Sequence, residues 1–394
     1  MDASLTFPSP RDVERFCIDN NGHEPFRLRL KRPKIDFQDI LTDQLVVRQE
    51  MSERFKRLID TPGYLFPSKS YLAQASSCQT ALWKADKLLA YLRPKPSIWD
   101  ATGGSGVDSW AFEHLGARLI VTEVDPHLAL LHTHNSQVLG SQRAVYQIRA
   151  EDFDLDQSFA AIYVDPSRLD HRGQRVYHPA DSLPNPLTEL PKWFGAAPWV
   201  MIKLSPMVDS AEALRCFPSC RFVWTLSVKR EVKELLLLCH AESSSAAPEH
   251  WAVDLLGNGA ERYAWKIDSA CHAPSLSAPK RYVYDADASI IAARGVPTVA
   301  AHFHLEQLHP EARLLTSDHF YPEFPGRIFE LESIHTPFED AWPDGASVVV
   351  RGFPEKAEMI RKRMRLKENA EHYLLATCWL DGQRGFLRAR RKSA

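Results

Sequence analysis

The chain has 394 residues, of which 44% are hydrophobic and 25% are charged, an ordinary composition for globular domains. Its length favours two or three domains over one. With 48 Lys and Arg against 50 Asp and Glu, the formal net charge is −2, which excludes a uniformly basic chromatin-type protein and an acidic disordered one.

Residues 1–95 are predicted to form a helical N-terminal region. Apolar residues recur at helical spacing over 38–60, and Thr61-Pro62-Gly63 ends that helix. A second helical stretch runs from about 68 to 92 and stops before two prolines, Pro94 and Pro96.

Residues 96–240 change to alternating strands and helices, which is typical of a parallel sheet covered by helices. Lys229-Arg230 is expected to be the turn of a strand pair within 221–239. The other strands are expected at 97–100, 118–123, 145–148, 160–164 and 199–203.

Two further segments follow: a small β-rich element at 241–280 and a basic α+β domain at 281–394. The last domain is expected to contain a strand at 347–350, a basic helix at 354–366 and a hairpin turning at Asp381-Gly382. Residues 351–394 hold 12 Lys or Arg and five Asp or Glu, a net charge of +7. Such a basic end fits a docking surface for a polyanion and fits a solvated helix face equally well.

The sequence shows no sign of export, membrane insertion or metal binding. It contains no apolar window of 18 residues and no signal-peptide pattern, and its seven cysteines form no CxxC pair. The pairs His132/His134 and His302/His304 lack nearby Cys or carboxylate ligands at metal spacing. We therefore expect a cytoplasmic protein with reduced thiols and no metal.

A glycine-rich loop, Asp100-Ala-Thr-Gly103-Gly104-Ser-Gly106, ends one predicted strand and opens a helix. Glycines let the backbone approach a ligand closely, and a helix start offers free N–H groups. No Gly-Lys-Ser/Thr follows, so the loop is not a P-loop, and Ser109 stands where a dinucleotide fingerprint needs its third glycine.

Three acids follow successive predicted strands: Asp100, Glu123 and Asp152. In a doubly wound sheet the carboxyl ends of the strands border one crevice. An acid there can neutralise an ammonium group, another can bind both ribose hydroxyls, and a third can accept from an adenine amino group. S-adenosylmethionine carries all three groups, whereas each acid taken alone could be a helix cap or a surface residue.

The successive stretches DATGGSG, VTEVDP, AEDF and VDPSR resemble the motifs of class I S-adenosylmethionine-dependent methyltransferases. The resemblance covers roughly residues 95–240 and implies an α/β fold with a doubly wound, Rossmann-like sheet of seven strands. It also implies that Glu123 holds the ribose and Val124 lies against the adenine, with the adenine edge at Asp152 and Phe153. The methionine end would be lined by Asp100, Thr102, Gly103, Gly104 and Gly106.

A closer resemblance extends over nearly the whole chain, through YLFPSKSYLAQASSCQTALWKADKL, DPSRLDHRGQR, KRYVYDADASIIAARG and LLTSDHFYPEFPGRIFEL. These stretches are similar to largely uncharacterised bacterial methyltransferases with a C-terminal THUMP-like domain. The resemblance implies a ferredoxin-like piece at 241–280 and a THUMP-like domain at 281–394. THUMP domains bind RNA, which agrees with the basic C-terminal segment.

The catalytic position implied by the resemblance is Asp165-Pro166-Ser167-Arg168. Amino-group methyltransferases carry Asp/Asn-Pro-Pro-aromatic there, with the acid and a carbonyl accepting the amine hydrogens and the aromatic stacking on the base. This chain keeps the first two residues and lacks the aromatic, so an exocyclic amine is not established as the acceptor. Asp-Pro-Ser could also be an ordinary turn.

The predicted substrate contacts are cationic. Arg168, Arg172 and Arg175 lie in one loop with Tyr177, which suits a phosphate path with stacking, although a solvated charged loop would look the same. The full predicted set of substrate contacts is Arg172, Arg175, Lys203, Lys362, Arg363 and Arg365. Gln74 and Ser76 are candidates for covering the cofactor.

These patterns favour a methyltransferase acting on structured RNA such as rRNA or tRNA. Three alternatives stay open: a methyltransferase of a protein or small molecule, a non-catalytic RNA-binding protein with the same fold, and an NAD oxidoreductase. The missing third glycine counts against the last of these.

Overall fold

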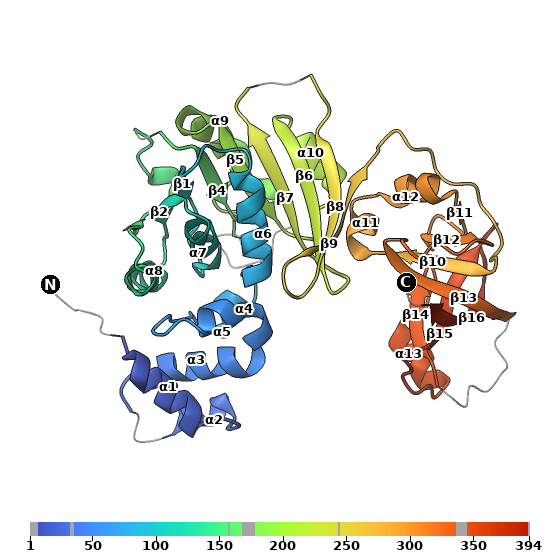
Figure 1. The fold of residues 1–394 in the computed structure, drawn as a ribbon, viewed down its shortest axis with the longest axis horizontal. Coiled ribbons are helices and arrows are strands. Elements are labelled where there is room, and N and C mark those ends of the chain that lie inside the picture. Colours follow the sequence, from blue (N-terminus) through green and yellow to red (C-terminus); the bar gives the residue numbers. More distant parts are fainter. Residues whose placement is uncertain are drawn as a thin grey trace. The chain divides into compact units, whose positions relative to one another are not determined.

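The computed structural model describes residues 7–31, 35–156, 158–167, 178–242, 245–335 and 345–392 (Figure 1). The chain divides into two compact units. The first unit consists of Met1–Val223, Glu234–Pro248 and Leu255–Ala260, and the second of Trp224–Lys233, Glu249–Asp254 and Glu261–Ala394.

The first unit begins with the predicted helical region. Its helices are α1 (Pro10–Asp19), α2 (Pro25–Leu30), α3 (Gln38–Glu50), α4 (Ser52–Ile59), α5 (Lys69–Leu72) and α6 (Cys78–Leu89). Each helix predicted from periodicity is divided in two. The first is interrupted at Met51, whose backbone leaves the helical region, and the second restarts at Ser77, which forms a capping box with Thr80.

The α/β sheet predicted for residues 96–240 is present. Its strands are β1 (Ser97–Asp100), β2 (Arg118–Thr122), β3 (Ala144–Tyr146), β4 (Ala161–Val164), β5 (Trp199–Leu204), β6 (Cys220–Val228), β7 (Glu231–His240), β8 (Glu249–Leu255) and β9 (Glu261–Ile267). They lie in the order β3-β2-β1-β4-β5-β7-β6-β8-β9, with β1 to β5 parallel and β7 antiparallel to β5.

The predicted count of seven strands is wrong, because β8 and β9 extend the sheet to nine. Both come from the segment expected to be a separate β-rich element. β8 buries Ala252, Val253 and Leu255, so this strand needs cover that an isolated hairpin could not supply.

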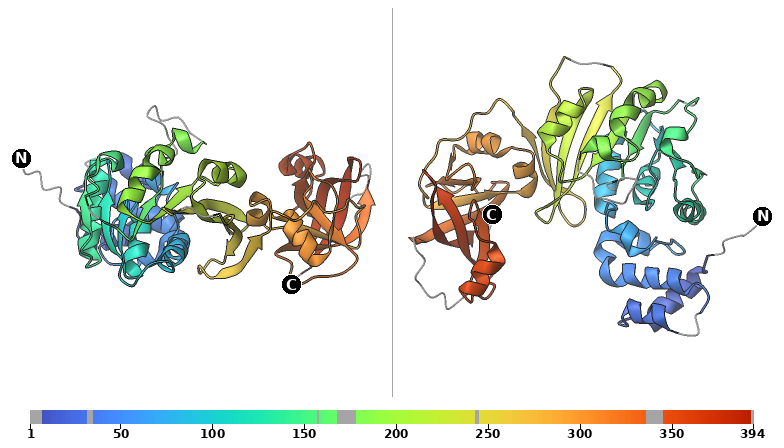
Figure 2. Two further views of the ribbon diagram at one scale, coloured as in Figure 1. Left: turned by 90° about the horizontal axis from the view of Figure 1, so that it is seen from above. Right: turned by 180° about the vertical axis from the view of Figure 1, so that it is seen from behind.

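Helices cover both faces of the parallel strands. The connecting helices are α7 (Val107–His114), α8 (Pro126–Val138), α9 (Pro186–Ala196) and α10 (Ser210–Cys216), with short 3₁₀ turns η1 (Ala150–Asp152) and η2 (Pro179–Asp181). Views from opposite sides show α6 and α7 over one face and α9 and α10 over the other (Figures 1 and 2). β4 is buried along its whole length, as expected for a strand covered on both faces.

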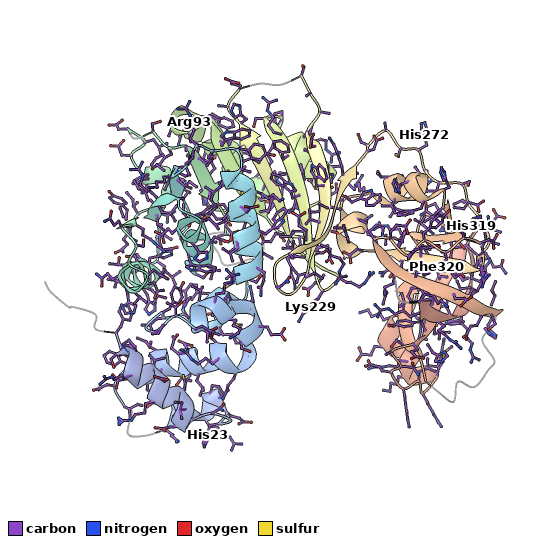
Figure 3. The ribbon with its side chains drawn as sticks, in the orientation of Figure 1. His23, Arg93, Lys229, His272, His319 and Phe320 are labelled. Atoms are coloured by element: carbon purple, nitrogen blue, oxygen red, sulfur yellow. The ribbon has the colours of Figure 1, made fainter. Side chains whose placement is uncertain are left out.

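The predicted strand pair within 221–239 is confirmed as β6 and β7. Lys229 and Arg230 form the turn with positive φ angles of 52° and 63°. Lys229 lies at the tip of this turn (Figure 3).

The second unit contains a seven-stranded sheet in the order β11-β12-β10-β13-β16-β15-β14. Its elements are β10 (Tyr282–Ala286), α11 (Ala288–Ala292), α12 (Val296–Phe303), β11 (Glu306–Gln307), β12 (Leu314–Ser317), β13 (Gly326–His335), β14 (Ser347–Arg351), α13 (Ala357–Arg363), β15 (His372–Trp379) and β16 (Gln383–Lys392). The predicted hairpin at Asp381-Gly382 joins β15 and β16. No helix in the described parts of the chain is long and apolar enough to span a membrane.

Candidate cofactor and active site

A cavity of about 650 Å³ opens at the carboxyl ends of β1, β2 and β4 in the first unit. This is where ligands bind in doubly wound sheets, and the volume is within the range of small-molecule pockets. Its lining residues are Ser70, Tyr71, Gln74, Ala101, Thr102, Gly104, Thr122, Glu123, Val124, Asp125, Leu128, Ile148, Arg149, Ala150, Glu151, Asp165, Pro166, Ser167, Leu183 and Pro184.

The glycine loop follows β1, and there is no room for a side chain at Gly103. A Cβ atom there would lie 2.7 Å from Val121 Cγ1 and 2.8 Å from His132 Nε2. Gly106 has a φ of +80° at the start of α7, a conformation that side chains disfavour. The loop is therefore drawn tightly onto β2 and α8, and Gly104 is left on the cavity wall.

Hydrogen bonds hold Gly104 from both sides. Its N–H donates to Glu123 Oε2 over 2.6 Å, and its carbonyl is 3.2 Å from His132 Nε2. The other ring nitrogen of His132, Nδ1, accepts from Arg143 over 3.1 Å, and Arg143 is ion-paired with Glu113. Burial and the nearby Arg143 lower the pKa of His132 to about 3, so the ring stays neutral and donates through Nε2.

Glu123 lies at the end of β2 with its carboxylate on the cavity. Besides the Gly104 amide it accepts the backbone N–H of Asp125 over 2.8 Å. Burial raises the pKa of this carboxyl, and the backbone hydrogen bonds oppose that rise. A carboxylate has about four acceptor positions, so Glu123 can still receive two hydroxyl donors. The geometry fits the diol of a ribose.

Asp100 is the last residue of β1 and is not among the residues that line the cavity. Its side chain is fully buried and accepts from the Thr102 amide over 3.2 Å and from the Ser109 hydroxyl. Burial raises its pKa to about 7. Thr102 lines the cavity whereas Asp100 does not, so a direct contact of Asp100 with a ligand stays a prediction.

The Asp165-Pro166-Ser167 segment lines the same cavity as Glu123. The Asp165 amide donates to Thr102 Oγ1 over 2.7 Å, which ties this segment to the glycine loop. The Ser167 amide donates to the Leu183 carbonyl over 2.7 Å. Sequence-distant segments after β1 and β4 are thus joined at one cavity, as their positions after parallel strands predict.

Asp152 and Phe153, which were predicted to lie at the adenine edge, do not line the cavity. Asp152 is exposed, and Phe153 packs against Trp99 and Tyr146. The preceding residues 148–151 line it instead, and Asp152 is the last residue of the turn η1. Val124 is exposed and lines the cavity as expected, and the roles of Asp152 and Phe153 stay predictions.

The helical region adds a wall that sequence reasoning found only in part. Gln74, a predicted cover for the cofactor, lines the cavity, whereas Ser76 is buried and donates to Asp108 over 3.0 Å. Tyr71, which was not predicted, lines the cavity and donates its hydroxyl to Asp125 over 2.7 Å. The stretch YLFPSKSYLAQASS contains these residues, but its periodicity alone does not show which of them face the sheet.

Two of the histidines that were considered as metal ligands make hydrogen bonds to backbone carbonyls. His132 holds the glycine loop, and His134 Nε2 is 3.0 Å from the Gly63 carbonyl. In the described segments a single group of three ligand-type side chains has its donor atoms within 4.8 Å of one another, namely His309, Glu311 and Cys378. His309 Nδ1 already accepts the Glu311 amide, which disfavours a metal at the other ring nitrogen.

Known proteins that are similar to this chain include methyltransferases. Two curated relatives from strains of Mycobacterium tuberculosis, both named as uncharacterised S-adenosylmethionine-dependent methyltransferases, are 23% identical over 343 residues, which covers 83% of this chain and 89% of theirs. The predicted resemblance to S-adenosylmethionine-dependent methyltransferases is confirmed. A crystal structure of a proposed methyltransferase from Porphyromonas gingivalis W83 matches with a TM-score of 0.81 and 23% identity over 98% of this chain and all of the other, which confirms the fold.

A family model described as a ferredoxin-like domain matches residues 282–325. This match begins at β10, downstream of the segment 241–280 for which a ferredoxin-like piece was expected. The second unit thus contains a ferredoxin-like part, and its THUMP-like character stays a prediction.

The predicted substrate contacts fall into three groups. Arg168, Arg172 and Arg175 lie outside the described residues. Lys203 is buried, does not line the cavity and pairs with Asp165. The remaining cations are exposed on or beside α13 in the second unit, where Arg363 pairs with Glu355 over 2.8 Å; they are Lys362, Arg363 and Arg365.

Proposed function

We propose that this protein binds S-adenosylmethionine in the 650 Å³ cavity and transfers its methyl group to structured RNA, such as rRNA or tRNA. The observation that carries the cofactor half is the joining of Gly104, Glu123 and Asp165 at one cavity. When bound, S-adenosylmethionine supplies a methyl group already activated by its sulfonium, so the protein mainly has to align the reactants.

Each part of the site has a task in this proposal. Glu123 accepts the ribose hydroxyls, Val124 and residues 148–151 border the adenine, and the glycine loop receives the methionine end. Asp165 lines the same cavity and accepts a hydrogen bond from the methyl acceptor, which directs the acceptor's lone pair towards the methyl group. Pro166, Ser167 and Arg168 shape this position, and no metal is required.

The RNA half rests on charge. The segment 351–394 has a net charge of +7, and three arginines, Arg168, Arg172 and Arg175, follow Asp165 closely in the sequence. In the second unit, Lys362 and Arg365 are exposed cations that lie three positions apart in the chain. Such groups bind phosphates without reading sequence and make affinity fall with salt.

Mass spectrometry of RNA nucleosides from cells with and without the gene tests the proposal. One methylated nucleoside should disappear in the deletion strain, return with the wild-type gene and not return with Asp165→Ala. An unchanged nucleoside profile, together with label transfer from S-adenosylmethionine to proteins, would replace RNA by a protein substrate.

A further inference from the structure

Lys203 is an unusual residue for its place at the end of β5. The strand is buried from Val200 to Leu204, and the Lys203 side chain is only 1% exposed. Its ammonium group binds Asp165 Oδ2 at 2.5 Å. Lys203 itself does not line the cavity, so it reaches the reaction site only through Asp165.

A second buried lysine extends this arrangement. Lys84 on α6 is fully buried and lies 2.9 Å from both Asp108 on α7 and Glu234 on β7. The Tyr163 hydroxyl on β4 also donates to Asp108, over 2.9 Å. Two buried ammonium groups thus pair with three carboxylates, of which Asp165 is 27% exposed at the cavity and the other two are largely buried.

The charges of this group are interdependent. Burial would raise the pKa values of Asp108 and Glu234, but Lys84 and then Lys203 outweigh it and hold both below their usual values. Lys203 therefore stabilises the charged forms of Asp108 and Glu234 besides pairing with Asp165. Unpaired charge at such depth is costly, so the lysine has little freedom to move away.

We propose that Lys203 is a positioning residue that fixes Asp165 through Oδ2 and leaves Oδ1 as the oxygen that accepts the substrate hydrogen. This inference rests on the proposed function. A carboxylate free to rotate would misplace the acceptor, and a misplacement of about 1 Å can cost about 100-fold in rate.

The test measures methyl transfer from tritiated S-adenosylmethionine to total RNA from a deletion strain, over a range of RNA concentrations. Lys203→Met should lower the rate at saturating RNA by about 10- to 100-fold, with the half-saturating RNA concentration and the affinity for S-adenosylhomocysteine within about threefold of wild type. Lys203→Arg should recover part of the loss. Lys192→Met, which removes an exposed lysine of α9, is the matched control and should change nothing.

A double-variant cycle separates positioning from general damage. If Lys203 acts through Asp165, then Lys203→Met combined with Asp165→Asn should be no slower than Asp165→Asn alone. Independent, multiplying losses would overturn the proposal, as would a Lys203→Met enzyme of normal rate. If Lys203→Met fails to bind S-adenosylhomocysteine, Lys203→Gln takes its place, and loss of binding in both variants would show a purely structural lysine. No transfer by the wild type would instead refute the proposed function.

Discussion

Replacing Lys84 by Met is the perturbation for which the structure gives the clearest magnitude. The change removes the ammonium group between Asp108 and Glu234 and keeps the apolar stem. Lys84 is fully buried, and the two carboxylates are 12% and 4% exposed, so water cannot replace the lost partner. Breaking a buried pair in this way costs about 3 to 5 kcal/mol.

That loss is a large part of the 5 to 15 kcal/mol by which domains are typically stable. The matched control is Lys56→Met, because Lys56 pairs with Asp60 at the surface with 72% and 57% of the side chains exposed. A surface pair contributes about 1 kcal/mol or less. The two substitutions are chemically the same, so the difference between them measures burial of the ion pair.

The contribution of Asp108 and Glu234 to stability should also depend on pH in opposite ways in the wild type and in Lys84→Met. In the wild type the lowered pKa values of Asp108 and Glu234 contribute stability above the unfolded pKa values of about 4, and this contribution disappears as pH falls through the lower folded values. In Lys84→Met burial should raise the folded pKa values of these carboxyls above their unfolded values. The unfolding free energy of the variant should therefore come closer to that of the wild type as pH falls from 7 to 5.

Urea unfolding followed by hydrogen exchange of peptides from β4 and β5 measures this in the first unit alone. Equal unfolding free energies for Lys84→Met and Lys56→Met at pH 7, or a difference that does not narrow at pH 5, would refute the reasoning.

Three further predictions concern the cavity. Glu123→Gln should weaken S-adenosylhomocysteine binding about 10- to 150-fold in calorimetry, since a charged hydrogen-bond acceptor is lost; unchanged affinity would remove Glu123 from the ribose. Gly103→Ala should destabilise the first unit by about 1 to 3 kcal/mol in urea unfolding, because its Cβ meets Val121 and His132, and a neutral effect would contradict the tight loop. Affinity for S-adenosylhomocysteine should rise as pH rises through about 7, the pKa to which burial raises Asp100, because only the ionised acid attracts the ligand's ammonium group; Asp100→Asn should abolish that rise.

The order of strands and helices in the first unit follows from the sequence because alternation of the two periodicities is a local signal. Asp125-Pro126 begins α8 where an N-cap and a first-turn proline predict a helix start. By contrast, β10 is buried at all five positions and shows no alternation of polar and apolar residues, so the sequence pattern does not separate it from a short buried helix.

The sequence indicates which residues follow the strands that end at the cavity, but it does not indicate the buried ion pairs behind them. Glu123 and Asp165 are recognisable because each follows an apolar strand, and parallel strands end at one edge. Lys84 and Glu234 are 150 positions apart in the chain, and no local pattern pairs them. Tyr71 escaped prediction for the same reason, because its partner Asp125 is supplied by the tertiary fold.

A crystal structure of the protein with S-adenosylhomocysteine tests the central claim most directly. The account predicts the ligand in the 650 Å³ cavity, with both ribose hydroxyls on Glu123 and its sulfur turned towards the wall formed by Asp165. A ligand bound elsewhere, or a cavity that stays empty at saturating ligand, would contradict it.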